Sequence, residues 1–243
     1  MTDVPMTFCD DVWQRTADLV RAIHDHPFNT ALGDGTLERD RFAFYIVQDG
    51  RYLEAFSKTL ATASARATDP ADAAFYAQSA HTALAAERML HAGYLSEFGL
   101  TADELAGIAT SPTCLAYASY LQATALTAPY PVLAAAVLPC FWIYQDVGTA
   151  LVGRSGPDHP YHKWISTYAD PDFAASVDQA KSITNRLAAA ADPPTRAAMV
   201  EAYCRAAAYE WMFWDSAWHR EPWPTNRWLS PTPDPATSLL TGS

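Results

Sequence analysis

The sequence predicts an all-α protein, a helical bundle with a single domain, and three observations support that prediction. The chain of 243 residues has only ten glycines, whereas alanine, the strongest helix former, is abundant. Half of the residues are hydrophobic, which is enough for a sizeable buried core. Alternating runs of β-branched residues, the usual mark of strands, are missing.

Apolar residues recur with helical spacing in long segments and one short segment. In chain order the long segments are 7–27, 38–67, 71–98, 112–127, 131–153, 171–191 and 194–220, and the short one lies near 159–168. Turn residues separate them, at Gly33-Asp34-Gly35, Asp69-Pro70, Gly99, Ser111-Pro112, Pro129-Tyr130-Pro131, Gly156-Pro157 and Pro193-Pro194. Long helices with short links predict one bundle domain over residues 1–221.

The first segment, 7–27, ends in two histidines. Such side chains near a helix C-terminus complement its dipole, so we expect His24 and His26 to serve the helix end rather than chemistry. The last segment of the chain, 222–243, carries five prolines and cannot continue a helix. We expect a tail there, with Trp223 and Trp228 holding its first part against the bundle and its final residues disordered.

The chain carries 27 acidic and 16 basic residues, for a net charge of -11. That charge argues against nucleic acid or an anionic membrane as partner. The N-terminus lacks the pattern of a signal peptide, and no uninterrupted apolar run is long enough for a membrane span, so a cytoplasmic protein is expected. The four cysteines, Cys9, Cys114, Cys140 and Cys204, form no Cys-x-x-Cys pair and are expected as free thiols.

Three of the predicted helices carry a reactive side chain on an otherwise apolar face. On 38–67, Asp49 lies in a stripe with Tyr45 and Tyr52; on 131–153, Cys140 lies one turn before Tyr144; on 194–220, Glu210 interrupts an apolar row. A buried carboxylate without a partner costs several kcal/mol or stays neutral through a raised pKa. Each carboxylate could pair with a tyrosine, an arginine or a helix end, and a cysteine alone is a small core residue. Together they predict a small-molecule site in the bundle core.

Four segments resemble the thiaminase II (TenA/THI-4) family, in that family's order. They are HPFNTALGDGTLERDRFAFYIVQD at 26–49, LPCFWIYQDVG at 138–148, KWISTYADPDF at 163–173 and YEWMFWDSAW at 209–218. The resemblance extends over about residues 8 to 220. It implies a haem-oxygenase-like bundle without haem or another cofactor, in the branch of the family that has a catalytic cysteine, and a homo-oligomer, commonly a tetramer.

The resemblance also implies a reaction and a site. The reaction is hydrolysis of an aminomethyl pyrimidine, and of thiamin, to hydroxymethyl pyrimidine in thiamin salvage. Cys140 is implied as the nucleophile, Glu210 as the principal acid and base, and Asp49 as the carboxylate that holds the pyrimidine amino group. The implied substrate-binding residues are Tyr52, Tyr117, Tyr144, Tyr168 and Phe213.

Two alternatives remain open at this point. The same kind of bundle serves di-iron oxidases, and Glu87 with His91, and Asp215 with His219, each lie one turn apart, a spacing that can put two metal ligands on one face. Charge-rich helices produce such pairs by chance. The other alternative is a regulatory protein that binds an aminopyrimidine without catalysis, although pure binding needs no nucleophile such as Cys140.

Overall fold

The computed structural model describes residues 6–98, 107–225 and 228, with the side chains of 86–98 left out. Every regular element in those ranges is a helix, so the all-α prediction is confirmed. In chain order the helices are α1 (Phe8–Arg15), α2 (Ala17–His24), α3 (Pro27–Asp34), α4 (Arg39–Arg66), α5 (Pro70–Phe98), α7 (Pro112–Thr127), α8 (Tyr130–Val152), α9 (His162–Tyr168), α10 (Pro171–Ala190) and α11 (Pro193–His219).

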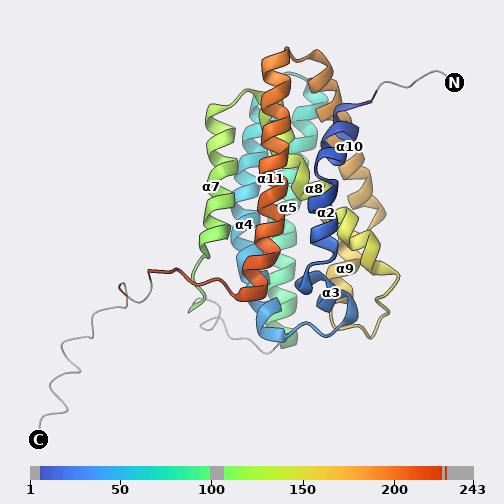
Figure 1. The fold of residues 1–243 in the computed structure, drawn as a ribbon, viewed down its shortest axis with the longest axis vertical. Helices are drawn as coiled ribbons and strands as arrows, with labels where there is room; N and C mark the ends of the chain where they lie inside the picture. Colours follow the sequence, from blue (N-terminus) through green and yellow to red (C-terminus); the bar gives the residue numbers. More distant parts are fainter. Residues whose placement is uncertain (1–5, 99–106, 226–227, 229–243) are drawn as a thin grey trace, which may run out of the picture.

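The long helices run roughly along the long axis of the molecule, with α7 at one side and α10 toward the other (Figure 1). Helix α8 packs against α10 and α11, and α4 packs against α5 and α7. Helix α8 is long and apolar enough to cross a membrane. However, 78% of its apolar stretch of 18 residues is buried inside the bundle. A helix that is apolar on all sides and enclosed by its neighbours is the core helix of the bundle.

Several predicted turns supply the caps that begin the helices. Ser111, Asp170 and Asp192 each precede a proline at the first helical position and accept a backbone N–H from the first turn of α7, α10 and α11. Proline fits there because its missing N–H would have no partner inside the helix. The helix starts expected at Ser111-Pro112 and Pro193-Pro194 are therefore confirmed.

The N-terminal prediction was wrong in two respects. Residues 7–27 form two helices and the start of a third, because the backbone leaves helical geometry at Thr16, with a φ of -101° and a ψ of 7°. His26 does not serve a helix C-terminus. It begins α3, and its Nδ1 accepts the Phe28 N–H at 3.1 Å. The break expected at 33–35 is confirmed, since Gly35 ends α3 with a φ of 72°, which favours glycine.

The first part of the C-terminal tail contacts the bundle near the start of α7. Trp223 Nε1 donates to the Thr110 carbonyl at 2.7 Å, and the Glu221 carboxylate accepts the Thr113 N–H at 3.0 Å. Trp228 is exposed. The disorder expected at the end of the chain concerns residues outside the described ranges.

Candidate active site

A cavity of about 300 Å³ lies among five helices. Its deep part is formed by buried residues of α4 and α8, including Asp49, Phe56 and Cys140. Its mouth lies on the side of α5, α9 and α10, because the lining residues of those helices include exposed ones. The full lining is Asp49, Leu53, Phe56, Leu60, Phe75, Gln78, Ser79, Thr82, Ala83, Cys140, Phe141, Tyr144, Thr167, Tyr168, Phe173, Ser176 and Gln179.

Helix α8 presents Cys140 to the deep end of this cavity, with 9% of the residue exposed. Pro139, directly before it, lies inside the helix and has no N–H to offer the carbonyl one turn earlier. Burial raises the pKa of the Cys140 thiol well above its usual value, and the nearby Glu210 carboxylate raises it further, while the Tyr52 hydroxyl acts in the opposite direction. The resting side chain is therefore the thiol, and a base must remove its proton before it can act as a nucleophile.

Helix α4 presents Asp49 to the same end of the cavity. The residue is 2% exposed, and its Oδ2 atom is buried without a hydrogen-bond partner among the described residues. Burial raises the pKa of this carboxyl to about 7. A buried acceptor that lacks a partner is costly, so a ligand that supplies an N–H in the cavity gains the hydrogen bond that the protein does not make.

Glu210 on α11 lies one layer behind the cavity lining. It is 1% exposed, and the Tyr117 hydroxyl donates to its Oε1 atom at 2.6 Å. Burial raises the pKa of the Glu210 carboxyl to about 8, against the lowering effect of the Tyr117 hydrogen bond, and Asp49 contributes in the same direction as burial. A carboxyl with a pKa close to neutral can both give and take a proton under ordinary conditions.

Aromatic rings connect these groups. Tyr52 stacks on Tyr117 with ring centroids 4.8 Å apart and lies 5.7 Å from Phe213, and Tyr144 lies 4.9 Å from Tyr168. The Tyr52 hydroxyl is buried beside the Cys140 thiol, whose pKa it lowers. A flat ring at the deep end of the cavity would meet the rings of Tyr144 and Tyr168, which line it.

The structure brings together the predicted site residues in two layers. The cavity itself is lined by Asp49, Cys140, Tyr144 and Tyr168. The layer behind it holds Glu210, Tyr52, Tyr117 and Phe213, none of which lines the cavity. The electrostatic influence of Glu210 and Tyr52 on Cys140 shows that the two layers are adjacent at the thiol.

Sequence reasoning missed the polar residues nearer the mouth of the cavity. They come from α5, α9 and α10 and are Gln78, Ser79, Thr82, Thr167, Ser176 and Gln179. Gln78 and Thr82 lie one turn apart, as do Ser176 and Gln179, so each pair shares a helix face. Polar residues on helix surfaces are common, however, and nothing in the sequence separates these pairs from ordinary solvent-facing ones.

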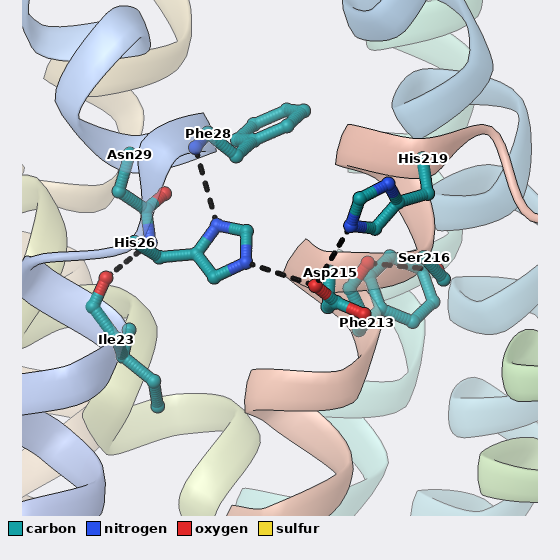
Figure 2. Close-up of polar contacts among 8 residues, drawn as sticks. All are labelled: Ile23, His26, Phe28, Asn29, Phe213, Asp215, Ser216 and His219. Carbon is teal, nitrogen blue, oxygen red and sulfur yellow. Dashed lines mark hydrogen bonds and ion pairs between the residues drawn. The ribbon is translucent and has the colours of Figure 1, made fainter.

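The residues considered for a metal site lie elsewhere or outside the described side chains. Asp215 Oδ1 lies 3.4 Å from Nε2 of His219 and 3.4 Å from Nε2 of His26 (Figure 2). None of these three residues lines the cavity. Glu87 and His91 are among the side chains that are not described. Among the described side chains, His26, Asp215 and His219 included, no group of three or more His, Cys, Asp or Glu has the geometry to hold a metal ion.

The sequence is similar to those of known proteins over most of its length. Residues 13–220 match the TENA/THI-4/PQQC family. The chain is 32% identical to the aminopyrimidine aminohydrolase of Bacillus subtilis over 219 residues, which cover 90% of this chain and 92% of that protein. It is 30% identical to the aminopyrimidine aminohydrolase of Halalkalibacterium halodurans, over 91% of this chain and 100% of that one. It is also 38% identical to the thiamine biosynthesis multifunctional protein ThiED of Corynebacterium efficiens, of which it spans 28%.

Solved structures agree on the fold. A TenA homologue from P. horikoshii aligns with a TM-score of 0.79 at 24% identity, over 88% of this chain and 99% of that one. A domain with a haem-oxygenase-like fold from Shewanella denitrificans aligns with a TM-score of 0.69 at 14% identity, over 87% and 92% of the two chains. The predicted haem-oxygenase-like architecture is confirmed.

Proposed function

Because this chain belongs to the TENA/THI-4/PQQC family, we propose that it is an aminopyrimidine aminohydrolase of thiamin salvage, a thiaminase II. It converts an aminomethyl pyrimidine, and thiamin, to hydroxymethyl pyrimidine. Relatives named aminopyrimidine aminohydrolase match it over nearly their whole length, which supports this activity. The observation that carries the proposal is a thiol and an unpaired carboxyl at the deep end of one cavity, Cys140 and Asp49, with the Glu210 carboxyl adjacent.

The deep end of the cavity suits an aminopyrimidine ring. The unpaired Oδ2 atom of Asp49 accepts a hydrogen bond from the exocyclic amino group of the ring. Tyr144 and Tyr168 contact the ring from the lining, and Tyr52, Tyr117 and Phe213 complete the aromatic wall behind. Stacking and one charged or polar contact together fix the ring in a single orientation.

The chemistry follows from the thiol and the adjacent carboxyl. A base, for which Glu210 in its ionised form is suited, removes the thiol proton of Cys140. The sulfur then forms a bond to an electron-poor ring carbon as Glu210 delivers that proton to a ring nitrogen. The ring electrons then expel ammonia, from a protonated aminomethyl group, or neutral thiazole, from thiamin, and each leaves with the bonding pair of its C–N bond. Water adds to the methylene and gives one proton to the Glu210 carboxylate, which passes it to solvent. The carbon–sulfur bond then breaks with its electron pair on sulfur, and the thiolate takes the proton from the ring nitrogen.

Turnover of both substrates by the purified protein tests this function. The aminomethyl pyrimidine should yield hydroxymethyl pyrimidine and ammonia, and thiamin should yield hydroxymethyl pyrimidine and thiazole. Activity should persist in a chelator and without added iron. Absence of turnover on both substrates, or a requirement for stoichiometric iron bound through Glu87, His91, Asp215 or His219, would favour the alternatives of a binding protein or a di-iron oxidase.

We also propose that the enzyme is a cytoplasmic homo-oligomer, a tetramer, and that the outer face of α7 takes part in the assembly. None of the residues Pro112–Thr127 carries a charge, and Leu115, Ser119, Gln122 and Leu126 are exposed along one side of the helix. Leu126 is 79% exposed. In a chain with a net charge of -11, an uncharged stripe is where two copies approach with least repulsion.

A further inference from the structure

We propose that the mouth of the cavity, through Gln78 of α5 and Gln179 of α10, binds the leaving group and selects substrates whose leaving group is unphosphorylated and ends in an uncharged hydrogen-bonding group. This inference rests on the proposed function, because it takes the ring to lie at the deep end beside Cys140. It adds a subsite for the part of the substrate that departs.

The size of the cavity calls for such a subsite. A cavity of about 150 Å³ is enough to hold benzene. The cavity here measures about 300 Å³, so one six-membered ring leaves space for a second group of similar size. The aminomethyl pyrimidine would leave that space to water, whereas thiamin would fill it with its thiazole.

The exposure of the lining residues shows on which side of the ring the remaining space of the cavity lies. Asp49 and Cys140 are buried, whereas Gln78, Thr82 and Gln179 are exposed. A ring held by Asp49 and attacked by Cys140 occupies the buried end. The group attached to its methylene therefore extends toward the exposed end, where the two glutamines come from two different helices.

The polar side chains of the mouth offer both hydrogen-bond donors and acceptors, and none of them carries a charge. The Thr167 hydroxyl donates to the Lys163 carbonyl at 2.8 Å and the Ser176 hydroxyl donates to the Asp172 carbonyl at 3.0 Å, so both oxygens are left to accept. The Gln78 amide donates to Thr82 Oγ1 at 3.3 Å, which leaves its carbonyl oxygen and its second N–H for a ligand. A hydroxyl group, which both donates and accepts, suits this set, whereas a phosphate brings negative charge that no lining cation balances.

Two substrates with different leaving groups test the subsite. Thiamin is long enough to place its thiazole and hydroxyethyl group at the mouth. The leaving group of the aminomethyl pyrimidine is only an amino group on the methylene, so it does not reach the mouth. In the double variant Gln78→Ala, Gln179→Ala, we expect the ratio of kcat/KM for thiamin to kcat/KM for the aminomethyl pyrimidine to fall about tenfold, the effect of one or two neutral hydrogen bonds. The control is Asp178→Ala, because Asp178 is 80% exposed beside Gln179 and does not line the cavity; it should keep the wild-type ratio.

A second variant reverses the selection. Gln179→Lys places a cation at the mouth and should raise the ratio of kcat/KM for thiamin monophosphate to that for thiamin by about tenfold. An unchanged ratio in both variants, with wild-type protein active on both unphosphorylated substrates, would overturn the leaving-group subsite and leave the proposed function intact. Wild-type protein that turns over neither substrate would instead overturn the proposed function on which the subsite depends.

Discussion

Asp49 and Glu210 are buried carboxyls that are held partly neutral by the apolar bundle around them. Their pKa values are raised to about 7 and about 8. An unfolded Glu or Asp loses its proton near pH 4, so from about pH 4 to 8 the folded state binds more protons than the unfolded state. The free energy of unfolding contributed by these two groups therefore falls as pH rises through that range.

Thermal unfolding between pH 5 and 9 tests the Glu210 contribution. The variant Glu210→Gln is neutral at every pH, so its melting temperature should fall less across this range than that of the wild type, by several degrees. The difference between the two proteins removes the effect of other titrating groups, such as His24. Parallel curves for the two proteins would show that the Glu210 carboxyl is ionised when buried.

The variant Asp49→Asn tests the proposed contact with the pyrimidine amino group. The amide keeps the shape of the side chain, but it replaces an acceptor by a group that can present its own N–H₂. We expect the affinity for hydroxymethyl pyrimidine, measured by calorimetry, to fall about 10- to 100-fold, in line with the loss of a hydrogen bond to a charged group. Activity should fall with it, because the ring loses its orientation. Unchanged affinity would remove Asp49 from ring binding.

At the residue scale, the sequence predicts the deep end of the cavity and misses its mouth. Asp49, Cys140 and Glu210 stand out because a polar group on an apolar helix face is unusual and expensive to bury. Gln78 and Gln179 lie on helix surfaces, where polar side chains are the norm, so only the three-dimensional arrangement of α5 and α10 reveals that they face one cavity.

Among the elements, α8 and α9 hold part of the site through one close approach. A Cβ atom at Gly148 of α8 would lie 2.7 Å from the Tyr168 Cβ and 2.8 Å from the Tyr168 carbonyl carbon. Backbone atoms at that distance cannot yield without a shift of the helix end. The absence of a side chain at Gly148 therefore allows α9 to bring Tyr168 to the cavity.

The variant Gly148→Ala tests this role. We expect a loss of about 1–3 kcal/mol in the free energy of unfolding, typical of overpacking, together with a higher KM, because Tyr168 lines the cavity. Gly153→Ala is the matched control, since a Cβ atom added to Gly153 would meet nothing within 4 Å and the φ of this residue is -66°. Denaturant unfolding and steady-state kinetics of both variants give the comparison. Equal behaviour of the two variants would contradict the role of Gly148.

The N-terminal helices show where periodicity fails as a predictor of elements. The apolar spacing continues through Thr16, so 7–27 is predicted as one helix, yet the backbone departs from helical geometry at Thr16 and α1 ends there. No proline or glycine marks this break, so the apolar spacing alone does not locate it. The later helices begin after caps followed by proline, and their starts are predictable for that reason.

On the scale of the whole molecule, the uncharged face of α7 predicts an assembly. Light scattering at micromolar concentration should give a mass well above the 26.6 kDa of one chain, about four times that value for a tetramer. The variant Leu126→Glu should lower this mass, because it places like charges on the stripe of each copy. Leu126→Met keeps the stripe apolar and should retain the wild-type mass. A monomeric wild-type protein would contradict the assembly.

The reaction assigned to the whole molecule depends on the thiol of Cys140, and one variant tests it most directly. Cys140→Ser keeps nearly the same shape but replaces the thiol by a far less acidic and less nucleophilic hydroxyl. Single-turnover and steady-state rates on the aminomethyl pyrimidine and on thiamin should both fall at least about 100-fold, while hydroxymethyl pyrimidine binds with wild-type affinity. Near wild-type rates on both substrates would show that Cys140 is a packing residue of the core and that the covalent mechanism is wrong.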